Sequence, residues 1–183
     1  MLQVSDVELL ALVARGEEAA LRELVERHSA WLLLRLRRRT PDEDLAHDAL
    51  HDTFVAVWRK PGAFRGDGDV GAWLWGIAIR QLISRIRKKA PPSPAGAEVI
   101  AAHSPLVASA EDELLVAVAH GHVGDALRTL SPELVQVLQA TVLDGLSTRE
   151  AAVLLGIPQG TVKSRMRIAK ARLREHLVPL EGW

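Results

Sequence analysis

Hydrophobic and polar residues alternate along this chain with the period of an α-helix almost throughout. In the segment 71–89, for example, Trp75, Ile79, Leu82 and Ile86 recur at intervals of three and four residues and form one apolar stripe. No segment alternates convincingly with the two-residue period of a strand. The pattern predicts an all-α fold, with helices at about 5–15, 17–38, 41–59, 71–89, 111–129, 132–143, 147–155 and 159–176.

Helix start and stop signals support several of these boundaries. The spacing Ser/Thr-x-x-Glu, typical of a capping box, occurs at 5–8, 40–43 and 147–150. Gly156 can supply the positive φ that ends a helix, and Pro158 fits the start of the next one. A short helix, a tight turn and a second helix are therefore expected around Gly156, which is the arrangement of a helix-turn-helix unit.

The composition changes between 90 and 110, where the chain is rich in proline, alanine and other small residues. Such a segment is typical of a linker. With 183 residues, 48% of them hydrophobic, the chain can bury a core on each side of it. We therefore expect two small helical domains at 1–89 and 111–183, joined by a linker at 90–110.

The formal net charge is zero, but the charges are unevenly distributed. Basic residues gather at 35–39, 80–89 and 163–174, whereas the segment 91–127 contains acidic residues and neither Lys nor Arg. Nucleic-acid binding depends on local basic patches, so a neutral total does not exclude it.

The absence of cysteine excludes disulfides, thiolate zinc sites and cysteine nucleophiles. The first residues include Asp6 and Glu8 rather than a basic signal-peptide region, and no apolar run approaches the roughly 18 residues of a membrane span. We expect a cytoplasmic protein without membrane insertion.

The segment 159–176 has two stripes at helical spacing. The apolar stripe, which we expect to pack on the domain, is Val162, Met166, Ala169 and Leu173. The basic stripe, one position further on, is Lys163, Arg167, Lys170 and Arg174. A solvated charged face normally mixes signs, whereas no acid interrupts the bases here until Glu175. Together with the helix-turn-helix spacing, this favours DNA binding over a merely solvated face.

Three further residues extend this expected DNA-binding surface. Gly160 and Thr161 lie in the first turn of the helix, where backbone N–H groups can meet a phosphate. Ser164 lies toward the base side, where a hydroxyl can form a sequence-specific contact.

The segment 42–59 has the opposite charge. It is expected to present Asp44, Asp48, His51 and Asp52 outward and to bury Leu45, Ala49, Phe54 and Val57. An acidic face suits a basic protein partner and not DNA, although this segment taken alone favours a solvated helix face.

His47 and His51 stand four residues apart, close to the spacing of a zinc-binding helix. Asp48 replaces the central Glu of that pattern, and no third ligand is evident. We therefore expect no metal and no other cofactor. A His/Asp metalloenzyme remains the alternative, and it would contain bound zinc or manganese.

The segment 71–89 places bases opposite its apolar stripe, at Arg80 and Arg87, with Ser84 between them and Trp73 nearby. Aromatic and basic side chains together can hold single-stranded DNA. Buried tryptophans are commoner, so Trp73 and Trp75 are interpreted as mainly structural. The glycine-rich segment 60–69 offers Phe64 and Arg65 to a ligand.

Taken in order, these segments resemble the bacterial RNA polymerase sigma factors of the extracytoplasmic-function type. DALHDTFVAVW resembles the helix of region two, and FRGDGDVGAWLWGIAIRQLISRIRKK resembles the promoter-melting segment. LSPELVQVL, GLSTREAAVLLGIPQGTVKSRM and ARLR resemble region four.

The resemblance implies a factor that binds core RNA polymerase, directs it to specific promoters and assists their opening, without covalent chemistry of its own. The first domain would bind the polymerase and the minus-ten element, and the second the minus-thirty-five element. An anti-sigma factor is also implied as a partner.

Residue by residue, the resemblance assigns three sites. Asp48, His51 and Asp52 match the face that binds the polymerase clamp, with His51 standing where glutamine is usual. The minus-ten residues are Phe64 and Arg65, in the loop that receives a flipped base, with Arg80, Ser84 and Arg87. Lys163, Ser164 and Arg167 match the recognition helix, which Gly160, Thr161 and Lys170 extend.

Besides His51, two positions depart from the family pattern: Arg80 stands at a frequent asparagine and Ile168 at a common arginine. The remaining alternative is a stand-alone helix-turn-helix regulator of the response-regulator output type. It leaves the WLWGIAIR segment and the acidic face unexplained.

Overall fold

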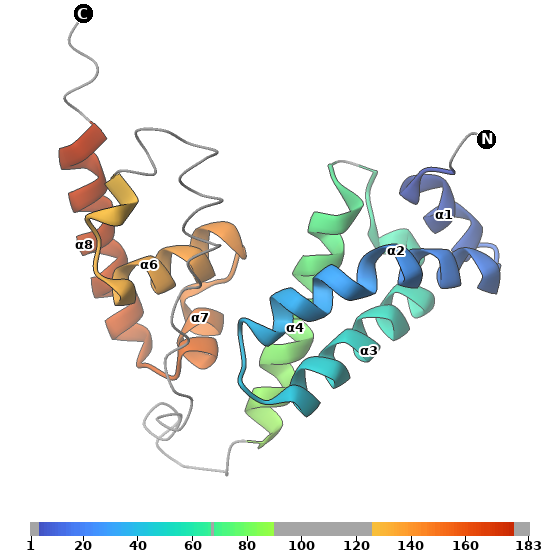
Figure 1. Ribbon diagram of the computed structural model, residues 1–183, viewed down its shortest axis with the longest axis horizontal. Helices are drawn as coiled ribbons and strands as arrows, with labels where there is room; N and C mark the ends of the chain where they lie inside the picture. Colours follow the sequence, from blue (N-terminus) through green and yellow to red (C-terminus); the bar gives the residue numbers. More distant parts are fainter. Residues whose placement is uncertain (1–3, 67, 90–125, 178–183) are drawn as a thin grey trace, which may run out of the picture. The chain divides into compact units, whose positions relative to one another are not determined.

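The computed structural model describes residues 4–66, 68–89 and 126–177, and every regular element in these ranges is helical (Figure 1). The predicted all-α fold is confirmed. The chain divides into two compact units, 1–89 and 90–183. The expected linker, and all of the expected helix at 111–129 except 126–129, lie outside the described residues, so the predicted domain boundaries stay a prediction.

The first unit is a bundle of long helices preceded by a short one. Its described elements are α1 (Asp6–Val13), α2 (Glu18–Arg37), α3 (Glu43–Arg59), the 3-10 helix η1 (Pro61–Ala63) and α4 (Val70–Lys89). Helices α2, α3 and α4 pack along one another (Figure 1). The largest fully buried hydrophobic side chains between them are Leu24, Leu32, Leu36, Val57, Leu74, Ile79 and Leu82.

The apolar stripes predicted for this unit form its core. In α4 the stripe residues Trp75, Ile79, Leu82 and Ile86 are all buried, and so is the predicted set in α3. The guanidinium of Arg35 lies 4.2 Å from the ring centroid of Trp75, so α2 adds a cation–π contact. Trp75 is a structural residue, as interpreted from the sequence.

A polar network holds α1 against α2. Asp6 accepts from Arg27 Nη1 at 2.8 Å and lies 2.7 Å from His28 Nε2. Trp31 Nε1 donates to His28 Nδ1 at 3.1 Å. Because the indole N–H can only donate, Nδ1 of His28 is the acceptor and its Nε2 carries the proton toward Asp6.

The capping predictions are confirmed at α1 and wrong at α3. Ser5 and Glu8 form the predicted capping box. At α3, however, the cap is Asp42, whose Oδ1 accepts from the N–H of Leu45 at 3.1 Å. Thr40 is buried and bonds the N–H of Asp42, while Glu43 pairs with Arg37 at 2.8 Å instead of reaching back. The helix therefore begins two residues later than predicted.

The second unit contains, in the part described, α6 (Pro132–Leu138), the π-helical turn η2 (Gln139–Leu143), α7 (Thr148–Leu155) and α8 (Gln159–Leu177). The expected single helix at 132–143 is thus α-helical only as far as Leu138. Its π turn ends with the N–H of Asp144 donating to the carbonyl of Gln139 at 2.9 Å. The core cluster is Leu130, Leu134, Leu138 and Ala169, with Leu127, Val135, Met166 and Leu173 packed against it.

Helices α7 and α8 form the predicted helix-turn-helix arrangement. Ser147 and Glu150 make the expected capping box, and Gly156 ends α7 in the left-handed conformation, with φ of 64°. Helix α8 begins directly after Pro158, whose carbonyl accepts from the N–H groups of Thr161 and Val162. Gln159 Nε2 donates to Thr148 Oγ1 at 2.9 Å and ties the starts of the two helices together.

None of the helices in the described ranges has the length and hydropathy required to cross a membrane.

Candidate DNA and polymerase interfaces

The two stripes predicted on α8 have the expected burial. Val162 and Ala169 are fully buried, and Met166 and Leu173 are partly buried against α6. Thr141 Oγ1 lies 3.1 Å from Met166 Sδ, which adds a contact to η2. The basic stripe, Lys163, Arg167, Lys170 and Arg174, is exposed along its whole length. It has no ion pair with an acid among the residues that the structure describes.

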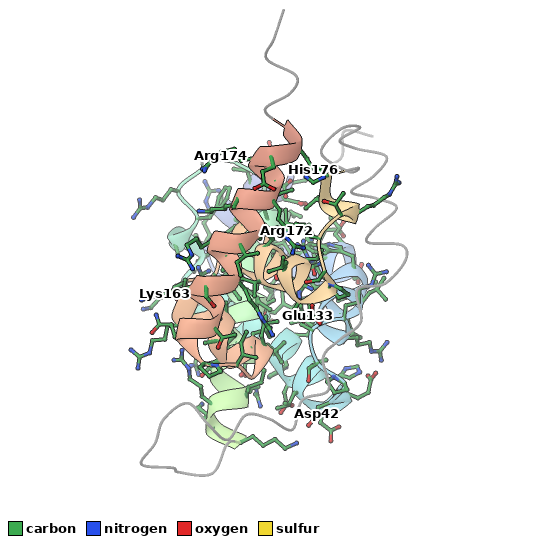
Figure 2. The ribbon with its side chains drawn as sticks, turned by 90° about the vertical axis from the view of Figure 1, so that its left-hand side faces the viewer. Asp42, Glu133, Lys163, Arg172, Arg174 and His176 are labelled. Carbon is green, nitrogen blue, oxygen red and sulfur yellow. The ribbon has the colours of Figure 1, made fainter. Side chains whose placement is uncertain are left out.

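A second basic flank lies across the helix from this stripe. Arg165 and Arg172 are seven residues apart, and Figure 2 shows Arg172 on the side of α8 away from Lys163 and Arg174. Arg165 is half-buried and near Glu133 of α6. The pKa of Glu133 is lowered mainly by hydrogen bonds from its own backbone and from Ser131, and further by the Arg165 charge. The number of basic residues in this segment does not by itself distinguish this flank, with its half-buried Arg165, from the exposed stripe.

The first turn of α8 differs from the prediction in one respect. The N–H of Thr161 donates to the carbonyl of Pro158 at 2.9 Å, so a phosphate contact from Thr161 would use its hydroxyl. Gly160 is exposed, as expected. Ser164 is also exposed, and its Oγ donates to the carbonyl of Thr161 at 3.0 Å. That bond occupies the hydroxyl hydrogen and leaves lone pairs to accept from a ligand.

The acidic face of α3 is balanced by a base that sequence analysis did not single out. Asp48 and His51 are exposed and Asp52 is half-buried. Arg85 of α4 reaches both carboxylates: its Nε and Nη2 lie 2.8 and 2.7 Å from Asp52 Oδ2, and its Nη1 contacts Asp48. The Arg85 side chain is only 27% exposed. The face therefore exists as an ion-paired surface between two helices.

A second ion pair joins the same helices at their adjoining ends. Lys89 donates to Asp42 Oδ2, and the N–H of Leu45 donates to Oδ1 of the same carboxylate. The hydrogen bond from Lys89 is the main reason that the pKa of Asp42 is lowered, with the backbone bonds adding to it. The pKa of Lys89 is correspondingly raised. Two bases of the run at 80–89 thus pair with α3.

The loop before α4 holds Phe64 against a tryptophan. The rings of Phe64 and Trp73 meet edge to face, with centroids 5.5 Å apart and planes at 60°. Both side chains are half-buried, while Arg65 is exposed. Asp69 Oδ1 accepts from the N–H of Ala72 at 2.7 Å and so caps α4. The half-buried Trp73 thus supports the loop through Phe64.

The polar residues of α4 are differently exposed. Arg80 and Arg87 are exposed, and Ser84 is half-buried. Arg80 Nη1 donates to the carbonyl of Gly76 at 2.9 Å, one turn earlier in the same helix. The guanidinium thus lies along the helix surface and not within the core.

The pair His47 and His51 does not acquire further ligands. His47 Nε2 lies 3.4 Å from Arg37 Nη2 and 3.8 Å from Glu43 Oε2, and the guanidinium opposes a metal cation there. Over the described ranges, no group of three or more His, Cys, Asp and Glu side chains is placed to hold a metal ion.

Comparisons with known proteins agree with this geometry. The family model "Sigma-70 region 2" matches residues 24–91, and "Sigma-70, region 4" matches residues 121–173. An ECF RNA polymerase sigma factor of Mycobacterium tuberculosis, SigM, is 36% identical over 172 residues, spanning 92% of this chain and 83% of the relative. Another, SigL, is 32% identical over 165 residues, spanning 88% of this chain and 90% of the relative.

Among solved structures, that of CnrH in complex with the cytosolic domain of CnrY is 26% identical and covers 96% of this chain and 99% of its own, with a TM-score of 0.43.

The matches to regions 2 and 4 occur in order, each on one of the two helical units, and the relatives extend over nearly the whole chain. A stand-alone helix-turn-helix regulator is therefore not favoured. The resemblance noted from the sequence is confirmed: the chain belongs to the ECF family of RNA polymerase sigma factors, which direct the polymerase to promoters.

Proposed function

We propose that this sigma factor divides its contacts between its two units. The first unit binds core RNA polymerase through α3 and the minus-ten element through Phe64, Arg65 and α4. The second unit binds the minus-thirty-five element through α8. The observation that carries this division is the separation of charge: the outward face of α3 is acidic and the outward stripe of α8 is basic.

For the polymerase, the proposal rests on Asp48, His51 and Asp52, which lie at successive turns on one side of α3. Arg85 already neutralises part of this charge. A basic partner would therefore share the carboxylates with Arg85 or displace it. Because each carboxylate has several lone pairs, Asp48 and Asp52 can accept from both cations.

For the minus-ten element, the proposal rests on the loop at 60–69 and the adjoining helix. Phe64 offers a ring whose position is fixed by Trp73, and exposed Arg65 supplies a charge for the phosphates. Arg80, Ser84 and Arg87 extend the contact along α4. A flipped base held on Phe64 would offset the few kcal/mol that unstacking costs, at roughly 1–3 kcal/mol per stacked base.

For the minus-thirty-five element, the proposal rests on the uninterrupted basic stripe. Lys163, Arg167 and Lys170 would neutralise phosphates, with Gly160 and Thr161 at the helix start. Ser164 would accept from a base amino group, since its hydrogen is directed to Thr161.

The proposal also covers the setting in which the protein acts. The chain performs no catalysis of its own, requires no cofactor, works in the cytoplasm and is regulated by an anti-sigma factor, as membership of the family implies.

The test is reconstitution with core polymerase. The full-length protein should co-elute with core enzyme and support transcription from a promoter selected with the holoenzyme, whereas core enzyme alone should not. Activity that required added zinc or manganese would favour the metalloenzyme instead. Binding to duplex DNA without any association with core polymerase would favour a stand-alone regulator.

A further inference from the structure

The outward face of α8 carries an apolar residue between two basic flanks. Ile168 is 42% exposed, one turn after Ser164 on the same side of the helix. On one side of it lie Lys163, Arg167, Lys170 and Arg174, and on the other Arg165 and Arg172. Ala169, the next residue, belongs to the core cluster, and Met166 and Leu173 pack against it, so Ile168 is directed away from the cluster.

Packing within the unit does not explain this isoleucine. The apolar stripe of α8 meets the core without it, and the exposed part of the isoleucine side chain gains no free energy of burial. Single exposed apolar residues are common, so the exposure of Ile168 alone decides nothing. Its position is informative. When basic side chains along both flanks of a helix contact phosphates, the face between the flanks lies against the edges of the base pairs.

The chemistry of the side chain then selects the ligand. Isoleucine has no donor or acceptor, so it cannot read the amino, carbonyl or ring-nitrogen groups of a base. The major groove presents one apolar group, the C5-methyl of thymine. The flanking cations supply the charge complementarity that makes duplex DNA the occupant of this face.

We propose that Ile168 contacts the methyl group of a thymine in the upstream promoter element and so determines specificity for thymine at one position. The inference rests on the proposed function of α8 as the helix that binds this element.

The experiment removes only the methyl group. A duplex is first selected from a random library with the full-length protein bound to core polymerase. Each thymine of the upstream element is then replaced in turn by deoxyuridine, and the dissociation constant of the holoenzyme is measured. At one position the wild-type protein should lose about threefold to fourfold in affinity, the value expected for one buried methyl.

The variant Ile168→Ala should bind the thymine duplex about threefold to tenfold more weakly and should no longer distinguish deoxyuridine at that position. A matched control is Val142→Ala, which removes an apolar side chain that is 61% exposed on η2. This control should keep the wild-type sensitivity. Helical circular dichroism of each variant checks the fold.

Three results would overturn the inference. The wild type could be insensitive to every replacement, Ile168→Ala could keep the full sensitivity, or Ile168→Ala could weaken assembly with core polymerase while leaving DNA affinity unchanged. If the holoenzyme selects no duplex at all, the proposed function fails first, and that result is distinct from a selected duplex without methyl dependence.

Discussion

The charged faces of α3 and α8 differ in what balances them. Part of the charge on the acidic face of α3 is neutralised from within its own unit, by Arg85 at Asp48 and Asp52, and Lys89 pairs with Asp42 at the start of the same helix. The basic stripe of α8 has no acidic partner among the described residues. A face paired internally contributes to holding its unit together, whereas a face without internal partners has its charge available for an external ligand.

The comparison also explains how the bases of α4 should be interpreted. The run at 80–89 is basic in the sequence, as is the stripe of α8. In the structure, Arg85 and Lys89 are directed to α3, while Arg80 and Arg87 remain exposed. The number of basic residues in such a run is thus an upper limit on the positive charge available to DNA, because some of them can form ion pairs with a neighbouring helix.

The largest expected effect tests whether the acidic face has a function beyond packing. Asp48→Asn/Asp52→Asn should weaken association with core polymerase at least about tenfold, if the carboxylates bind the partner directly. The matched variant Arg85→Gln removes the same internal ion pairs but keeps both carboxylates, so it should bind the polymerase at least as well as the wild type. Affinity for labelled core enzyme measures both.

Equal losses in the two variants would mean that the carboxylates act only by holding α3 to α4. The acidic face of α3 would then have a purely structural role, in contrast to the proposed DNA-binding role of the stripe on α8. Asp44→Asn, which changes an exposed acid on α3, controls for the general effect of charge.

The next effect separates the two basic flanks of α8. Lys163→Ala/Arg167→Ala should weaken binding to the upstream duplex, and should flatten the salt dependence by about 0.9 in log–log slope for each lost phosphate contact. Arg165→Ala/Arg172→Ala removes the same charge from the other flank and should change the slope less, because Arg165 is near Glu133. Affinity measured at several salt concentrations distinguishes them.

Identical slopes for the wild type and the first double variant would contradict the assignment of the stripe to DNA. Assembly with core polymerase should be unchanged in both double variants, since the proposed polymerase contact lies in the other unit.

A third prediction tests the loop that adjoins α4. Phe64→Ala should weaken holoenzyme binding to single-stranded minus-ten DNA by about 1–3 kcal/mol, the usual value of one base stacked on an aromatic ring. Binding to the upstream duplex should not change. A template with an abasic site at the flipped position is the control, because Phe64→Ala should have little further effect on it. A full effect on the abasic template would show that Phe64 does not receive that base.

The smallest effect concerns pH and the Asp42–Lys89 pair. The pKa of Asp42 is lowered in the folded protein, so its contribution to stability is present above the unfolded value of about 3.9 and is lost as pH falls through the folded pKa. The raised pKa of Lys89 confines the loss on the alkaline side to pH above about 10.4. Asp42→Asn keeps a good helix cap but removes the ion pair.

Thermal unfolding of the wild type and Asp42→Asn should therefore differ by at most a few degrees at neutral pH and converge as the pH falls through the lowered pKa of Asp42. A difference that stays unchanged as the pH falls through this range would mean that the cap, and not the charge, carries the effect.

Whether the sequence predicts a feature of the structure depends on how far apart along the chain the contacting residues are. The helices in the described ranges, the capping boxes at Ser5 and Ser147 and the left-handed Gly156 depend on residues at most four positions apart. They are confirmed, apart from the later start of α3 and the π turn after Leu138. The stripe of α8 was likewise predictable from helical spacing.

Contacts between distant residues were not predictable. Arg85 lies 37 residues from Asp48 and 33 from Asp52, and no periodicity distinguishes it from the other bases of α4. The shift of the α3 cap from Thr40 to Asp42 accompanies the ion pair of Glu43 with Arg37, which crosses the turn between two helices and follows no helical spacing. The assignments of individual residues to polymerase and DNA stay predictions.

The π turn η2 affects how the second unit tolerates changes in length. A π turn contains one residue more than the α-helical turn that it replaces, and each residue turns an α-helix by about 100°. Deleting one residue within 139–143 would be expected to restore α-helical geometry and to rotate the chain beyond it by about that angle. Leu146, which is 4% exposed and bonds through its N–H to the carbonyl of Ala140, would lose its present place. A one-residue deletion there should therefore disturb the approach to α7 more than a conservative substitution at the same position.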